Sequence, residues 1–141
     1  MNKSFLFLFV VTLLFSSGFI SNVFAQNEPV LYFCEKYDSK KGEVGVSDRF
    51  TTGYLTVMVK SDNALGLEDV HIQFDKLNER SKKFEFYKKF DYTIESDMSY
   101  VFFAKNSDSD LKFEEPGFYR VFLLDDNDKT VASALIEIIP K

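Results

Sequence analysis

His71 is the only histidine in the chain, so it is the first residue to consider for acid–base catalysis near neutral pH. It alternates with Val70 and Ile72, which places it on the polar side of its segment, facing solvent. No serine motif, Cys–His pair or zinc-type ligand cluster accompanies it. Two carboxylates could hydrolyse a glycoside without histidine, but 22 Asp and Glu residues single out no pair. The residues therefore favour a protein that is not an enzyme, with an enzyme of unknown type as an alternative.

A second group of residues has the chemistry of a calcium site. Oxygen donors alternate at Asn106, Asp108 and Asp110, and Glu114 follows within reach of the same loop. Hard oxygen ligands at this spacing suit Ca²⁺, so these four residues are candidate metal ligands. Leu111 stands where an EF-hand loop would turn on glycine, and Asn and Asp are also good turn formers. The alternative is a solvated loop with no cofactor.

A third group combines aromatic rings with basic side chains. Lys82-Lys83 and Lys88-Lys89 flank the segment Phe84-Glu85-Phe86-Tyr87. Lysines beside a hydrophobic strand commonly prevent edge-to-edge aggregation. If the strand is exposed, its rings could stack on sugars or its backbone could accept a partner strand. The candidate binding residues are Phe84, Phe86, Tyr87 and Tyr100.

Alternation of apolar and polar residues predicts the strands that position these groups. It is clearest at Glu68 to Asp75, where every second residue is apolar, and it recurs at residues 54–59 and 90–95. In the second of these segments, Leu55, Val57 and Val59 oppose Tyr54, Thr56 and Met58. Further strands are expected at Val30 to Cys34, Phe84 to Tyr87, Tyr100 to Ala104, Phe118 to Leu124 and Thr130 to Ile138.

Turn-forming residues separate these segments. Asp125 to Asp128 joins the last two strands in a predicted hairpin, and Leu77 to Arg80 is another predicted turn. The segment Glu35 to Thr52 is longer than most connections and contains Gly42 and Gly45. It is either a binding loop or, through Val44, Val46 and Phe50, a short edge strand. Seven or eight short strands predict an all-β fold, an antiparallel β-sandwich or barrel.

The segment Glu115 to Val121 resembles the entry to the penultimate strand of immunoglobulin-like domains. The resemblance implies that Tyr119 bonds back to the backbone at the corner and that Val121 points into the core. Antibody domains have a cysteine at the position of Val121 and a core Trp, which this chain lacks, so it is not of antibody type. Pro116 to Ile138 resembles the ending of bacterial secreted immunoglobulin-like and fibronectin-like sandwiches. This likeness implies an immunoglobulin-like β-sandwich and implies no function.

The N-terminus has the layout of a cleavable signal peptide. Lys3 precedes an apolar run from Phe5 to Phe15, and Ala25 supplies the small residue for cleavage. We predict a signal peptide at residues 1–25 and a single domain at 26–141, exported to the periplasm, the outer membrane or the extracellular space. The alternative is an uncleaved anchor from Phe5 to Phe24. Lipidation of Cys34 is not expected, because no small residue precedes it.

Removal of the signal peptide leaves an acidic chain. The full sequence has 17 Lys and Arg against 22 Asp and Glu, and the mature chain loses Lys3 alone, so its net charge is −6. Such a chain would repel nucleic acid. Cys34, the single cysteine, cannot form an internal disulfide and is expected to be buried, with pairing between chains as the alternative.

These features predict a secreted or periplasmic module that binds another envelope or surface protein. Carbohydrate binding through the surface aromatics and a secreted enzyme are the alternatives. Self-association is a further expectation, because edge strands can pair between copies.

Overall fold

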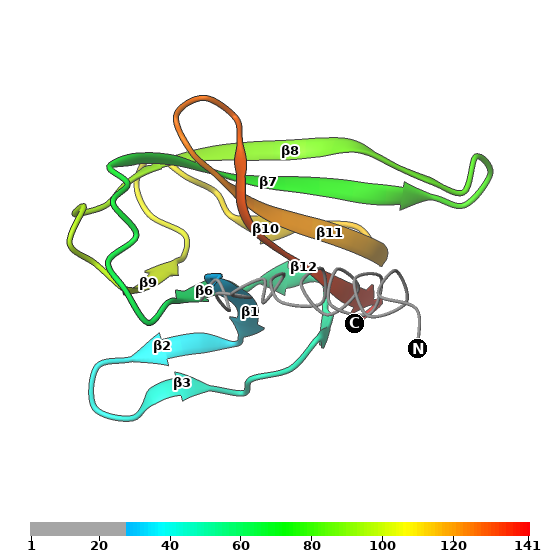
Figure 1. Ribbon diagram of the computed structural model, residues 1–141. Helices are drawn as coiled ribbons and strands as arrows, with labels where there is room; N and C mark the ends of the chain where they lie inside the picture. The colour runs from blue at the N-terminus through cyan, green and yellow to red at the C-terminus, as the bar shows by residue number, and fades with distance from the viewer. Residues whose placement is uncertain (1–27) are drawn as a thin grey trace, which may run out of the picture.

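Twelve strands and no helix form residues 28–141, which are the residues that the structure, a computed structural model, describes (Figure 1). The strands are β1 (Val30–Cys34), β2 (Lys36–Asp38), β3 (Gly42–Val44), β4 (Arg49–Thr51), β5 (Gly53–Tyr54), β6 (Thr56–Lys60), β7 (Asp69–Asn78), β8 (Lys83–Thr93), β9 (Tyr100–Phe103), β10 (Lys112–Phe113), β11 (Gly117–Leu124) and β12 (Thr130–Ile139). The predicted signal peptide lies outside the described residues. No helix suited to crossing a membrane occurs in the described part.

Two sheets form the sandwich. The larger has the strand order β4-β12-β11-β7-β8, and the smaller has the order β1-β6-β9. Their neighbouring strands are antiparallel, except that β4 runs parallel to β12. The short pairs β2–β3 and β5–β10 complete the structure. The prediction of an all-β, antiparallel, immunoglobulin-like sandwich is confirmed.

The core between the sheets follows the predicted alternation of β7. Val70, Ile72 and Phe74 are fully buried, whereas the residues between them are more exposed. The ring of Phe74 stacks on Phe113, with the ring centroids 4.2 Å apart. Full burial of such a side chain contributes about 1.5–3 kcal/mol, so this row of β7 is a main source of stability.

The tyrosine corner implied by the immunoglobulin resemblance is present. The hydroxyl of Tyr119 donates a hydrogen bond of 2.7 Å to the backbone carbonyl of Glu115. Tyr119 and Val121 are both fully buried. This bond fixes the corner at which the chain enters β11, the penultimate strand.

The predicted C-terminal hairpin is also present, as β11 and β12. At its tip, the Asp125 carboxylate accepts hydrogen bonds from the backbone amides of Asn127 and Lys129, at 2.9 and 2.8 Å. Asp128 has a φ of 61°, a conformation that Asn and Asp tolerate better than most residues. The short polar residues therefore form the turn for the reason the sequence indicated.

The segment Glu35 to Thr52 forms the β2–β3 hairpin and β4, the edge strand of the larger sheet. Of the two readings of this segment, the short edge strand is therefore correct for Phe50, which is buried in β4. Val44 ends β3 instead, and Val46 is exposed.

The β2–β3 hairpin contacts the outer side of the smaller sheet. Tyr37 stacks on Phe102 at 4.5 Å between ring centroids, and Glu43 accepts hydrogen bonds from the hydroxyls of Tyr32 and Tyr100. Met58 lies between Tyr32 and Phe102 in the strand register and is fully buried. The prediction that Met58 would be on a polar, outward face was therefore wrong.

Two further predictions were wrong at the β7–β8 hairpin. The turn was predicted at Leu77 to Arg80, but β7 continues through Leu77 to Asn78. The turn therefore comes later and includes Lys82, which has a positive φ of 56°. The segments Phe84 to Tyr87 and 90–95 were expected as separate strands, but β8 is one strand of 11 residues with a bulge. The bulge bends the strand without ending it, which a sequence pattern alone did not indicate.

Candidate functional site

Strand β8 has one side without a partner strand. It lies at the end of the larger sheet and pairs with β7 alone among the described strands (Figure 1). With 11 residues it is longer than β4 at the opposite edge, which has three. A long edge strand presents unpaired backbone groups that a further strand can bind.

The register shows which backbone groups of β8 are free. The amide of Ile94 donates to the carbonyl of Glu68, so every second pair from there is hydrogen-bonded between the two strands. The partners of the odd-numbered residues of β7 therefore point their amides and carbonyls away from β7. These residues are Phe84, Phe86, Lys89, Asp91 and Thr93.

A bulge at Tyr87 sets the direction of the nearby aromatic rings. Phe74 is opposite Lys88 and Asp75 is opposite Phe86, so Tyr87 is the extra residue of β8. The ring of Tyr87 packs edge-on against the buried Tyr119, at 5.5 Å between centroids. Phe86 points to the outer face, where 65% of its surface is exposed.

The outer face of the larger sheet carries further exposed apolar residues in β11 and β12, which lie two and three strands away from this free edge. Phe118 in β11 is 50% exposed and Leu135 in β12 is 57% exposed. Arg120, which is opposite Leu135 in the register, holds its guanidinium 4.7 Å from the centroid of the Phe84 ring. We call the set Phe84, Phe86, Phe118, Arg120 and Leu135 the β8 surface. Aromatic residues and arginine are the types enriched where proteins bind one another.

Basic side chains surround the β8 surface. Lys88 pairs with Glu114, and Lys89 pairs with Asp128. Each lysine lowers the pKa of its partner carboxylate, chiefly through the hydrogen bond that it donates. Lys83 has no ion pair within residues 28–141. The lysines at this edge can therefore form ion pairs with carboxylates from other parts of the chain.

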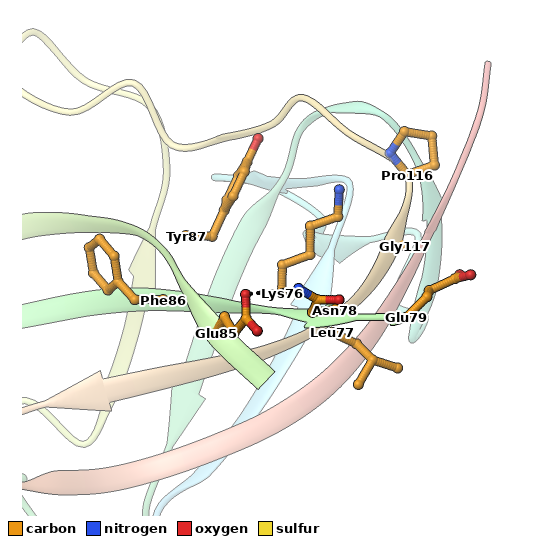
Figure 2. A pocket seen from close by; sticks show the side chains of 9 residues that line it. All are labelled: Lys76, Leu77, Asn78, Glu79, Glu85, Phe86, Tyr87, Pro116 and Gly117. Atoms are coloured by element: carbon orange, nitrogen blue, oxygen red, sulfur yellow. Dashed lines mark hydrogen bonds between the residues drawn. The ribbon is translucent and has the colours of Figure 1, made fainter. Parts of the chain in front are cut away.

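An open pocket of about 430 Å³ lies at the tip of the β7–β8 hairpin (Figure 2). Figure 2 shows Lys76 and Tyr87 extending in the same direction from neighbouring strands, with Pro116 and Gly117 on the far side. The Lys76 ammonium lies 5.8 Å from the ring centroids of both Tyr87 and Tyr119, and it pairs with Glu115. Burial raises the pKa of Tyr119, so that hydroxyl stays neutral. The pocket thus presents a cation and an aromatic wall beside the β8 surface.

The four predicted binding aromatics do not share one surface. Phe84 and Phe86 lie together on the β8 surface. Tyr87 points to the inner side of the same strand, toward Tyr119. Tyr100 belongs to β9 in the smaller sheet, where its hydroxyl bonds Glu43 and its pKa is raised to about 12, chiefly by that hydrogen bond.

The four predicted calcium ligands have separate roles. Asn106 accepts hydrogen bonds from the amides of Asp108 and Ser109, at 2.9 and 2.7 Å, which makes it a turn residue. Asp110 lies 3.8 Å from the Lys105 ammonium, and Glu114 pairs with a lysine. Among residues 28–141, no three His, Cys, Asp or Glu residues are grouped so that they could hold a metal ion. Calcium binding by these residues stays a prediction without support from their geometry.

His71 is held between two carboxylates. Its Nδ1 lies 2.7 Å from an oxygen of Asp91, and its Nε2 lies 3.9 Å from an oxygen of Asp128. Because Lys89 also pairs with Asp128, these side chains link β7, β8 and the β11–β12 turn. The arrangement ties neighbouring strands together on the outer face.

Phe118, Arg120 and Leu135 were not among the binding residues predicted from the sequence. Phe118 and Arg120 alternate with the buried Tyr119 and Val121, so their outward direction could have been read from the pattern. A large apolar residue on an outward position is the signal that was available.

Comparisons with known proteins place the chain in no family. No protein-family model matches it, and no curated protein matches it. Among solved structures, the chain is similar to an immunoglobulin-like protein from Pseudomonas aeruginosa, with 11% sequence identity and a TM-score of 0.45. That similarity covers 82% of this chain and 99% of the other.

Proposed function

We propose that this protein is an exported, non-catalytic module that binds another protein of the cell envelope through the β8 surface and the free edge of β8. The observation that carries the proposal is the position of this surface. Phe84 and Phe86 lie on a long edge strand with unpaired backbone groups. Arg120 connects them across β7 to the exposed Phe118 and Leu135 on the same face. Together they offer side-chain contacts and hydrogen bonds to the same partner.

The chemistry of the described residues supports a binding role. His71 is engaged by Asp91 on the exposed outer face, and no serine or cysteine of residues 28–141 is bonded to it. Cys34, the only cysteine, is fully buried, and burial raises the pKa of its thiol, which disfavours the reactive thiolate. Export is supported by the pattern of residues 1–25.

The test is site-specific photo-crosslinking in cells. A photoreactive residue in place of Phe86 should give one dominant adduct with an envelope protein. The same residue in place of Tyr54, which is also exposed but lies in β5, should not give that adduct. Identical adducts from both positions, or none from position 86, would contradict the proposal.

A proline tests the edge strand directly. Asp91→Pro removes an amide that points away from β7, so the fold should tolerate it. The matched control Asp91→Ala also removes the hydrogen bond to His71 but keeps the amide. We expect the adduct at position 86 to be lost with Asp91→Pro and kept with Asp91→Ala. Equal adduct yield from the two variants, both shown to be folded by circular dichroism, would argue against strand pairing.

A glycan is the second candidate partner, because the exposed ring of Phe86 could stack on a sugar. Binding to polysaccharides or peptidoglycan that disappears with Phe86→Ala and is unaffected by Asp91→Pro would favour the glycan. Binding no stronger than background to every polysaccharide and to peptidoglycan would exclude a glycan as the partner.

A further inference from the structure

We infer that the bound segment is an extended peptide of alternating acidic and apolar residues that adds to the free edge of β8; this rests on the proposed function. The first observation is a separation of charge. Residues 76–89 hold six basic side chains against two acidic ones, a net charge of +4, in a mature chain whose net charge is −6. The basic residues are Lys76, Arg80, Lys82, Lys83, Lys88 and Lys89.

The second observation is the order of side chains along the edge. Phe84 and Phe86 lie on the outer face, while Lys83 and Lys88 lie on the inner side of β8. Glu85 is also on the inner side, where its carboxylate accepts hydrogen bonds from Asn78 and Ser81. A strand added beside β8 would place its own residues alternately next to these two sets. Apolar residues fit beside the rings and carboxylates fit beside the lysines, which gives an alternating pattern. A further carboxylate fits beside Lys89 on the outer face.

The lysines already bind carboxylates of their own chain. Lys88 and Lys89 reach Glu114 and Asp128, which come from other parts of the fold. An incoming acidic segment would therefore meet side chains that can form such pairs, and it would also meet Lys83. Charge complementarity of this kind speeds association and selects partners more than it adds affinity.

The same lysines disfavour a second copy of this chain as the occupant. If two β8 strands paired antiparallel about their centre, Lys88 of one copy would face Lys88 of the other. Like charges directly opposite each other destabilise a sheet. The edge is thus unfavourable to self-pairing and favourable to an acidic strand.

The test measures peptide binding to the mature protein by fluorescence anisotropy. The probes are labelled eight-residue peptides with alternating Glu and Val, with alternating Lys and Val, and with Glu and Val around a central proline. The structure predicts binding of the first and at least about tenfold weaker binding of the other two. Raising the salt concentration from 50 to 300 mM should weaken binding of the acidic peptide, because the charges are exposed.

Charge-reversal variants locate the site. Lys83→Glu combined with Lys88→Glu should weaken binding of the acidic peptide about tenfold. The matched control Lys40→Glu lies at the β2–β3 turn and should change it less than about twofold. Asp91→Pro should also weaken binding, whereas Asp91→Ala should not.

Four results would overturn the inference. Equal binding of the acidic and basic peptides would remove the charge preference. Acidic-peptide binding that is unchanged by Asp91→Pro would remove strand addition. Binding to vesicles of phosphatidylglycerol, unaffected by Asp91→Pro and stronger than binding to the peptide, would assign the basic edge to a membrane. A cellular adduct at position 86 without acidic-peptide binding would refute this inference alone, whereas loss of the adduct would refute the proposed function as well.

Discussion

The β2–β3 hairpin shields the thiol of Cys34, so the rate at which that thiol reacts should report opening of the hairpin. Cys34 is fully buried, and the amide of the next residue, Glu35, donates a hydrogen bond of 3.0 Å to the Val44 carbonyl in the hairpin. A disulfide reagent can attack it only when β2 and β3 move away. The observed rate therefore depends on the free energy of opening.

Tyr37→Ala is the perturbation that should change this free energy most directly. The Tyr37 ring stacks on Phe102 at 4.5 Å and meets Tyr100 edge-on at 6.1 Å. Each aromatic pair contributes about 0.5–1.5 kcal/mol, so losing both costs about 2 kcal/mol. Since about 1.4 kcal/mol corresponds to a factor of ten, Cys34 should react about 30-fold faster in this variant.

The assay follows release of the aromatic thiolate from the reagent at pH 8 under native conditions. Tyr54→Ala is the matched control, because Tyr54 is an exposed tyrosine in β5 whose ring contacts Lys105 and Lys112 rather than the hairpin. It should leave the rate within about twofold of the unmodified protein. If Tyr37→Ala reacted no faster than Tyr54→Ala, the hairpin would not be what protects the thiol, and the reasoning would fail.

Further predictions concern the core, the corner and pH. Phe74→Ala should lower the free energy of unfolding by about 3–5 kcal/mol in urea denaturation, and a loss near zero would mean that β7 has another register. Tyr119→Phe should cost about 1 kcal/mol by removing the bond to the Glu115 carbonyl, and thermal unfolding at an unchanged midpoint would argue against the corner. The pKa of Glu43 is lowered by the hydrogen bonds from Tyr100 and Tyr32, so its contribution to the hairpin is present above pH 4.5 and is lost as the pH falls through that lowered pKa. Protection of the Glu35 amide, which donates to the Val44 carbonyl in the hairpin, should therefore decrease in hydrogen exchange at acid pH, and Glu43→Gln should remove that dependence.

The sequence predicted the parts of the fold that depend on local pattern. Val70, Ile72 and Phe74 face the core because one side of β7 is buried and side chains alternate. Tyr119 could be assigned to the corner because its motif contains both the tyrosine and the residues to which it bonds. In each case the residues that decide the structure are close together in the sequence.

The remaining features depend on residues that are distant in the sequence. Met58 is buried because the β2–β3 hairpin covers its sheet, and nothing near Met58 in the sequence indicates this cover. The bulge in β8 places Tyr87 against Tyr119, which lies 32 positions later. Phe118 and Leu135 are apolar in the sequence, but the alternation pattern does not show whether another part of the chain covers the outer face of their sheet.

The bulge at Tyr87 has a consequence for insertions and deletions in this strand. Phe84, Phe86, Phe90 and Tyr92 all have even numbers, so an uninterrupted strand would turn all four toward the core. The extra residue, Tyr87, shifts the alternation by one position. Phe84 and Phe86 therefore point outward, while Phe90 and Tyr92 point inward. Removing a single residue here, with no other residue substituted, would exchange interior for exterior positions over the whole tip of the hairpin. At this position the number of residues in β8, more than the identity of any one side chain, decides which side chains face the core.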